Sequence, residues 1–295
     1  MGQLSSRKRR FGDRSDGYRV RNLDPFFQII PCILRRRCDS QVMFDETLDL
    51  ETLDRYIRQK RSGDLPTLRL IHVLLAASVR TFSQKPKLNR FILGKKIYAR
   101  NCIKISIAIK RSMSEDGEET TVTPEFEPSD TLRDIVEKFD RIIAQNRGID
   151  DQKNSTDVTA RIVGACPTFL KSAIVVLIQW LDNRGLCPKI VGQVSPFHAS
   201  AFITDVGSLG IGAVFHHLYE FGTCSVFVAL GKRTTIPAVD ENGEACKKKA
   251  IGLRFVLDER ICDGFYSASA IKFMLRLLKR PELLEVPPEK IIEDS

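Results

Sequence analysis

The residues best suited to chemistry lie near the C-terminus, in the segment 251–266, which reads IGLRFVLDERICDGFY. Apolar and other residues alternate in its first half, which predicts a strand with one buried face. The strand ends in two acids, Asp258 and Glu259, and a turn at Asp263-Gly264 leads into an apolar-periodic helix. A carboxylate at the end of a buried strand can serve as a general base. An ordinary connection between a strand and a helix has the same pattern.

Histidines are the other candidate bases, because an imidazole has a pKa of about 6.5, close to neutral pH. His198, His216 and His217 lie in the same third of the chain as Glu259. Packing or hydrogen bonding at an interface is the plain alternative for these side chains. His72 falls within a predicted helix, where we expect a packed or surface side chain rather than a ligand.

The cysteines give no sign of a metal site, since none forms a CxxC pair or a zinc-like cluster with histidine. Most lie in apolar stretches, so we expect reduced cysteines in the core. The N-terminus is polar and basic and does not read as a signal peptide. We therefore expect no metal and a reducing, cytoplasmic location. The eight cysteines are Cys32, Cys38, Cys102, Cys166, Cys187, Cys224, Cys246 and Cys262.

Length and charge favour one large globular unit behind a basic arm. The 295 residues are 43% hydrophobic and 28% charged, which suffices for a sizeable core. The net charge of +9 is concentrated in part in the runs 7–10 and 35–37. Such runs suit nucleic acid, a membrane surface or a phosphorylated cofactor, or form a solvated tail. No aromatic residues interleave with them and no DNA-binding motif spacing occurs, so we expect no nucleic-acid partner.

The elements that must position these groups alternate along the chain. Segment 25–38 should pack inward through its apolar residues, which are Phe26, Phe27, Ile29 and Ile30. The predicted strands are 41–50, 102–110, 121–127, 199–206, 223–231 and 251–257. The predicted helices follow a cap at Asp49, open at Pro66, follow a cap at Ser129 or Asp130, and cover 169–181 and 265–278. A hairpin turn is expected at 116–117, and a surface loop at 146–157.

Two stretches resemble functional segments without meeting their requirements. The apolar run 169–181 contains Lys171 and is shorter than the ~20 residues that span a bilayer, so we expect a buried helix and no membrane partner. Gly207, Gly210 and Gly212 have phosphate-loop character, but no helix-forming segment and no Lys-Ser/Thr pair follow them. We therefore predict no nucleotide phosphate loop there.

The C-terminal third resembles a known family. The segments ITDVGSLGIG, VFVALGK, DERICDGFYSA and LLKRPELL occur in the order and spacing found in the catalytic domains of 2-oxo acid dehydrogenase acyltransferases. Chloramphenicol acetyltransferases share that fold, and ICDGFYSA is close to their form of the motif. The resemblance runs more loosely back to residue 18 and leaves no room for a lipoyl domain. It makes 1–17 the basic arm and 18–295 an acyltransferase-like catalytic domain, a stand-alone member of the family.

The resemblance implies a fold, an assembly and a reaction. The fold is α/β (α+β), a chloramphenicol acetyltransferase-like two-layer sandwich of mixed sheet and helices. The assembly is a homotrimer or higher homo-oligomer with its active site in a channel between subunits. The substrates are acyl-CoA, or a lipoyl thioester, and an acceptor that the sequence does not identify. Coenzyme A is the only cofactor implied.

The family motif His-x-x-x-Asp-Gly places functional roles on individual residues. Its Asp-Gly matches Asp263-Gly264, where the aspartate would make a structural ion pair with an arginine. The oxyanion-stabilising hydroxyl matches Thr204, and the position of the general-base histidine is occupied by Glu259. The arginine partner of Asp263 stays open among three neighbouring candidates, which are Arg35, Arg36 and Arg37.

The glutamate at the histidine position leaves three interpretations open. Glu259 could be the base of a working acyltransferase; His198, His216 or His217 could serve instead; or the site is inactive and the protein binds or scaffolds. A thiol of pKa about 8.5 transfers its proton to a glutamate less readily than to a histidine by about 2 pKa units, or roughly 3 kcal/mol. Burial raises a carboxyl pKa by up to several units and can close that gap.

Overall fold

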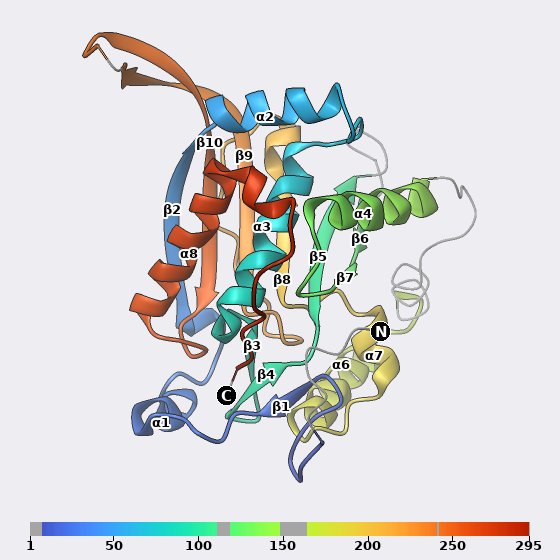
Figure 1. The fold of residues 1–295 in the computed structure, drawn as a ribbon. Coiled ribbons are helices and arrows are strands. Elements are labelled where there is room, and N and C mark those ends of the chain that lie inside the picture. Colours follow the sequence, from blue (N-terminus) through green and yellow to red (C-terminus); the bar gives the residue numbers. More distant parts are fainter. Residues whose placement is uncertain (1–7, 111–118, 148–163, 241, 295) are drawn as a thin grey trace.

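A computed structural model describes residues 8–110, 119–147, 164–240 and 242–294. At its centre is a seven-stranded mixed sheet in the order β2-β10-β9-β8-β5-β6, with β7 beside β5 (Figure 1). Its strands are β2 (Gln41–Asp49), β5 (Ile103–Lys110), β6 (Glu119–Val122), β7 (Glu125–Phe126), β8 (Ala201–Asp205), β9 (Val226–Val239) and β10 (Ala245–Asp258). Every strand predicted from alternation is present. The predicted hairpin turn at 116–117 lies outside the described residues, as does most of the loop at 146–157.

Strand β8 is the only strand of the large sheet's main path that runs parallel to both of its neighbours. Its partners β5 and β9 flank it, so its carboxyl end is held from both sides. The remaining pairs of the path are antiparallel, and β9 and β10 extend together as a long hairpin beyond the sheet (Figure 1).

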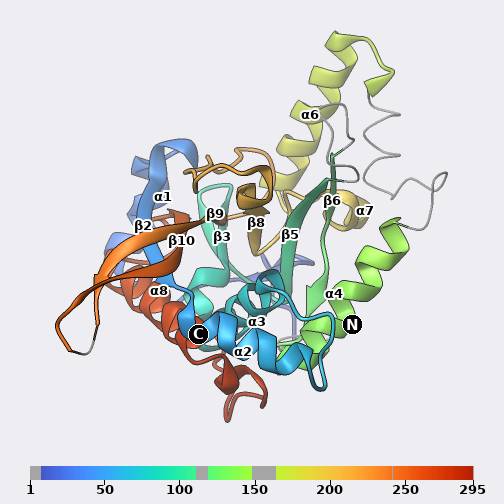
Figure 2. The ribbon, with the colours of Figure 1, turned by 90° about the horizontal axis from the view of Figure 1, so that it is seen from above.

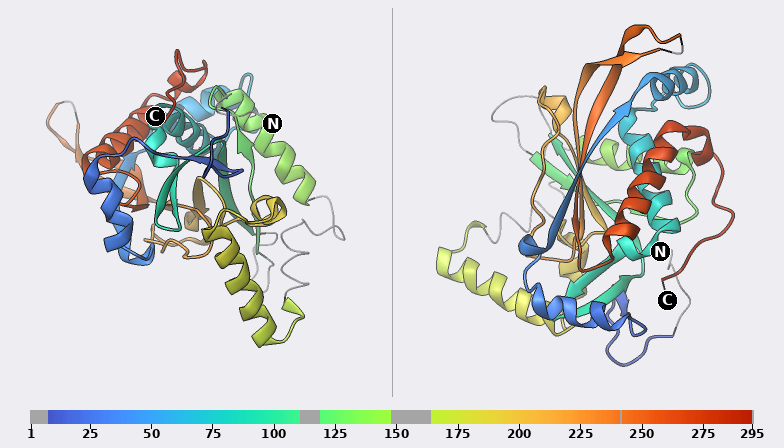
Figure 3. Two further views of the ribbon diagram at one scale, coloured as in Figure 1. Left: turned by 90° about the horizontal axis from the view of Figure 1, so that it is seen from below. Right: turned by 90° about the vertical axis from the view of Figure 1, so that its left-hand side faces the viewer.

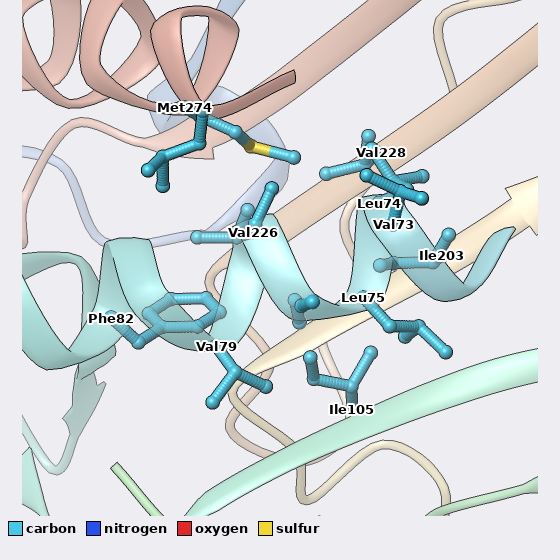
Figure 4. Packing of buried hydrophobic residues seen from close by; sticks show 14 of the residues in the cluster. Val73, Leu74, Leu75, Val79, Phe82, Ile105, Ile203, Val226, Val228 and Met274 are labelled. Carbon is cyan, nitrogen blue, oxygen red and sulfur yellow. The ribbon is translucent and has the colours of Figure 1, made fainter. Parts of the chain in front are cut away.

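Helices α2, α3, α4 and α8 cover one face of the large sheet (Figures 1 and 3). The α-helices are α1 (Pro25–Ile33), α2 (Glu51–Arg61), α3 (Leu70–Gln84), α4 (Leu132–Arg147), α6 (Thr168–Asn183), α7 (Lys189–Val194) and α8 (Gly264–Lys279). The central helix α3 is buried from His72 to Ser83 and is apolar on most sides, as a helix enclosed by neighbours must be. Val79 and Phe82 of α3 meet Val226 of β9 and Met274 of α8 (Figure 4).

The other face of the sheet carries a second, smaller cluster. Phe202, Phe227 and Val256 pack there against Leu218 and Cys224 from the loop 210–225. This loop begins at the second of the three spaced glycines, Gly210, and no helix forms in it, as predicted.

Glycines at positions 207 and 231 let the chain that follows β8 lie directly on β9. A methyl group at Gly207 would overlap with the carbonyl oxygen of Gly231, and one at Gly231 would overlap with the amide nitrogen of Ala213. Both approaches are tighter than any side chain allows.

Helix α6 is not the buried helix expected for 169–181. It extends away from the body (Figure 2), and Val176, Leu177 and Trp180 are 62%, 55% and 48% exposed. With respect to the described residues, the one buried residue of α6 is Asp182, at its C-terminal end. The inward packing expected of Phe26 and Ile29 on α1 is also wrong, since they are 61% and 54% exposed. Among the described residues, no helix is long and apolar enough to cross a membrane.

Two helix starts differ from their predictions. Helix α3 begins at Leu70 rather than at Pro66, because Arg69 is extended and its amide donates to Nδ1 of His72. Thr131 rather than Ser129 or Asp130 caps the start of α4, since its hydroxyl accepts from the amide of Asp134. Asp49 does cap α2, through the amide of Glu51.

A three-stranded sheet stands apart from the large one and ties down the N-terminal part. Its order is β1-β4-β3, with β1 (Gly17–Arg19), β3 (Arg90–Leu93) and β4 (Lys96–Arg100). The turn between β3 and β4 contains Gly94 and Lys95, both with positive φ. All eight cysteines are free, but only Cys224 and Cys262 are buried, so the expectation that most pack in the core is wrong.

Candidate active site

The end of β10 is built around a fully buried carboxylate, that of Asp258. Arg260 binds both of its oxygens at 2.7 Å, and Nε of Arg37 lies 3.5 Å from one of them. Arg37 and Arg260 are each only 3% exposed. Two buried guanidinium groups therefore share a single carboxylate.

Arg37 connects this carboxylate to the loop 210–225, which covers the face of the sheet away from α3. It donates to the carbonyl oxygens of Tyr219 at 2.6 Å and Gly222 at 3.2 Å. Its Nε has no hydrogen-bond partner among the described residues, since the 3.5 Å approach to Asp258 does not meet hydrogen-bond geometry. Burial lowers the pKa of the Arg37 guanidinium, against the opposing attraction of Asp258, and the nearby Arg260 lowers it further.

Glu259 follows Asp258 in the chain, and it projects away from the buried ion pairs into solvent. Its side chain is exposed, while its amide donates to the carbonyl oxygen of Ser40 at 2.9 Å and so holds the backbone. Asp263 is also exposed, and it caps α8 by accepting from the amide of Tyr266 at 2.8 Å. Of the three candidate arginines, Arg37 meets a carboxylate, and that carboxylate belongs to Asp258.

Thr204 is half-buried near the carboxyl end of β8. Its neighbour Ile203 is fully buried in the core beneath the helices, so Thr204 faces the opposite, loop-covered side of the sheet. Phe202 lies on that same side, two residues earlier.

Within one chain, Thr204 and Glu259 lie far apart. Thr204 pairs with Ala229 of β9, and Ala229 pairs with Arg254 of β10, five residues before Glu259. At about 3.3 Å per residue and about 4.8 Å per strand spacing, they are roughly 17 Å apart along the strands and 10 Å across them. A single chain therefore does not bring the two groups together.

His216 lies on the same side of the sheet as Thr204. Its ring stacks on that of Phe227, with 4.2 Å between centroids and 6° between planes, and Phe227 stacks in turn on Phe202 at 5.1 Å. His217 is exposed and stacks on His216 at 4.6 Å.

His198 belongs to a separate buried cluster that the sequence did not reveal. Its Nδ1 is 2.8 Å from the hydroxyl of Ser195 and its Nε2 is 3.1 Å from Asp182, which also binds Arg14 at 2.7 Å. The ligand atoms of Asp182, His198 and Cys187 lie within 4.8 Å of one another. Arg14 and Ser195 already satisfy this group, so it ties α6 to the N-terminal segment. No spacing in the sequence signals it.

A basic cavity of about 380 Å³ opens beside the buried arginines. It lies between α1, the β3–β4 turn and the C-terminal end of α6, and its cationic lining consists of Arg35, Arg37, Lys95 and Arg260. The basic run 35–37 was the only signal of it in the sequence.

No model of a protein family matches the sequence, and no curated protein matches it significantly. Solved structures, by contrast, match nearly the whole chain. A probable dihydrolipoamide acetyltransferase from Listeria monocytogenes is 14% identical, with a TM-score of 0.55 and coverage of 90% of this chain and 95% of that one.

Two further structures match to a similar extent. The dihydrolipoamide acetyltransferase of Azotobacter vinelandii is 14% identical, with a TM-score of 0.54 and coverage of 90% and 94%. The catalytic core of a 2-oxoacid dehydrogenase complex from Thermoplasma acidophilum is 13% identical, with a TM-score of 0.53 and coverage of 89% and 98%. The chain therefore has the α/β fold of these acyltransferase cores, as its sequence resemblance predicted.

Proposed function

We propose that this protein is a CoA-dependent acyltransferase, which moves an acyl group between a CoA or lipoyl thioester and an acceptor. The observation that carries the proposal is the fold, which the chain shares with acetyltransferase cores. Glu259, which follows the rigid end of β10, is the residue that the sequence resemblance matches to the histidine of the family motif. For one of those structures, the Azotobacter enzyme, a serine, a histidine and an asparagine have been studied for their roles in the catalytic mechanism. Thr204 and Glu259 are our candidates for the first two roles.

The proposed reaction converts one thioester into another thioester or into an amide. The Glu259 carboxylate takes the proton of the acceptor thiol or amine, which attacks the thioester carbonyl and forms a tetrahedral oxyanion. The Thr204 hydroxyl donates a hydrogen bond to that oxyanion. The intermediate then collapses, the C–S bond to CoA breaks, and the CoA sulfur leaves with the proton from Glu259. No metal is required by this sequence of steps.

Two copies of the chain would supply the two groups, because one chain separates them. Exposed apolar side chains support association, because helix α6 leaves Val176, Leu177 and Trp180 in contact with solvent. An oligomer interface would cover part of this apolar surface. It would also desolvate Glu259, and burial raises a carboxyl pKa toward the range that a base needs.

The test is turnover of acetyl-CoA with a panel of thiols and amines, measured as release of free CoA. Glu259→Gln should abolish turnover, while the exposed Glu289→Gln, the matched control, should leave it intact. Glu259→His should retain or raise it. An oligomeric wild-type protein that binds CoA without any turnover would instead support the alternative, an inactive family member that binds or scaffolds.

A further inference from the structure

The basic cavity between α1, the β3–β4 turn and α6 holds more positive charge than its surroundings neutralise. The buried Arg37 and Arg260 line it and share the single carboxylate of Asp258. Two buried guanidinium charges thus face one buried carboxylate, and the exposed Glu220 adds a further attraction to Arg37. Arg35 and Lys95 add two more cations at the rim.

The two acids of the cavity wall, Asp182 and Glu220, offset only part of the charge of its four cations. Asp182 is bound by Arg14 at 2.7 Å and by His198 at 3.1 Å. Glu220 is exposed, and one of its oxygens accepts from the amide of Cys38 at 2.7 Å.

Donors in the cavity are left without partners. Neither Arg35 nor Lys95 has an ion pair or hydrogen bond within the described part of the chain. Both side chains are therefore available to bind an anion in the cavity.

The position of Lys95 is also fixed at a cost. Its φ of 61° is left-handed, the only such value for a non-glycine residue in the described chain. The adjacent Gly94 sits so close to α6 that a Cβ would lie 2.5 Å from the carbonyl oxygen of Asn183, which holds the turn in place. A residue with a Cβ is strained in the left-handed region, so the turn holds Lys95 beside the cavity against its conformational preference.

We propose that this cavity binds a phosphate or diphosphate group, with Arg35 and Lys95 as its direct contacts and the buried charges of Arg37 and Arg260 behind them. Arginine forks match phosphate oxygens in pairs, and lysine adds a mobile point charge. The volume of about 380 Å³ is that of a small-molecule site. Because Arg260 directly follows Glu259, the cavity lies at the same end of β10 as the proposed base.

The natural source of such a group is the phosphate portion of CoA, and this assignment rests on the function proposed above. The anion site itself does not, because it follows from charge and geometry alone. The two ideas can therefore fail separately.

The first experiment is calorimetric titration of the full chain with inorganic pyrophosphate. The double variant Arg35→Gln/Lys95→Gly should bind at least about tenfold more weakly, since it loses two charge-assisted contacts. Its matched control is Arg36→Gln/Lys96→Gln, which removes the same charge from exposed neighbours that do not line the cavity. Glycine at 95 accepts the positive φ, so thermal unfolding should show both variants folded. Absent wild-type binding, or equal weakening in both variants, would overturn the site.

The second experiment repeats the titration with CoA, alone and in the presence of pyrophosphate. Competition together with a tenfold loss in the Arg35/Lys95 variant supports phosphate binding by this cavity and its use by CoA. CoA binding that ignores both substitutions and pyrophosphate refutes the assignment to CoA while leaving the acyltransferase proposal standing. Pyrophosphate binding without any CoA binding keeps the anion site and removes the proposed function.

Discussion

Arg260 holds both carboxylate oxygens of Asp258 at 2.7 Å, although only one residue separates them in the chain. The backbone amide of Arg260 donates to the same carboxylate at 3.2 Å. This closed ring forces the turn at the end of β10 and points Glu259, the residue between them, outward. The rigid element of the motif is thus Asp258, while Asp263 serves as an exposed helix cap.

Asp258→Asn should destabilise the protein by about 3–5 kcal/mol, because it leaves two buried guanidinium groups without a counter-charge. The free energy of unfolding, obtained by urea titration, measures this loss of stability. Asp263→Asn is the same chemical change at an exposed cap, where asparagine caps as well as aspartate, so its effect should be near zero. Equal effects at the two positions would contradict the structural role assigned to Asp258.

Stability should depend on pH through His72. Burial lowers the pKa of its imidazole to about 4, although Asp140 at 3.2 Å opposes the shift, and its Nδ1 accepts from the amide of Arg69. Between about 6.5 and 4 the unfolded chain binds a proton that the folded chain does not. Stability is therefore full above pH 6.5 and falls as the pH drops toward 4, by at most about 3 kcal/mol.

Urea unfolding at several pH values checks this dependence. His72→Gln should flatten the slope between pH 6.5 and 4, and His217→Gln, which alters an exposed ring, should leave it unchanged. An unaltered slope in His72→Gln would assign the acid sensitivity to other groups.

Gly207→Ala should destabilise the protein by about 1–3 kcal/mol, because the added methyl group overlaps with the carbonyl oxygen of Gly231 and lifts the loop from β9. Gly212→Ala meets nothing within 4 Å and should be neutral or slightly stabilising. Thermal unfolding of the two variants measures the difference. Since Gly207 lies three residues after Thr204, its variant should also lower acyl transfer.

His216→Phe distinguishes the two candidate bases, because a phenyl ring keeps the stacking on Phe227 and removes the imidazole nitrogens. If Glu259 is the base, turnover should stay within a few-fold of wild type. General bases contribute about 100-fold or more, so a loss of that size would transfer the role to His216. The rate of CoA release decides between them.

Alternation and motif spacing predicted the strands and the overall fold well, because β5 and the second half of β10 begin with alternating buried and partly exposed residues and β9 begins with a short apolar run. Helix α6 was mispredicted, since an apolar sequence such as 169–181 reads the same whether a core or only solvent lies beside it. The buried pair of Asp258 and Arg37 was equally unreadable. It joins residues more than 200 positions apart, and nothing in the run 35–37 distinguishes the buried arginine from its exposed neighbours.

The separation of Thr204 and Glu259 across one sheet makes the proposed catalytic unit a property of pairs of chains. Two variants that are each inactive, Thr204→Val and Glu259→Gln, should then rescue one another once their subunits are exchanged. In a randomly mixed symmetric oligomer about a quarter of the shared sites would combine an intact threonine with an intact glutamate. Such complementation between defective copies would let a cell that expresses both retain part of the activity that neither supplies alone.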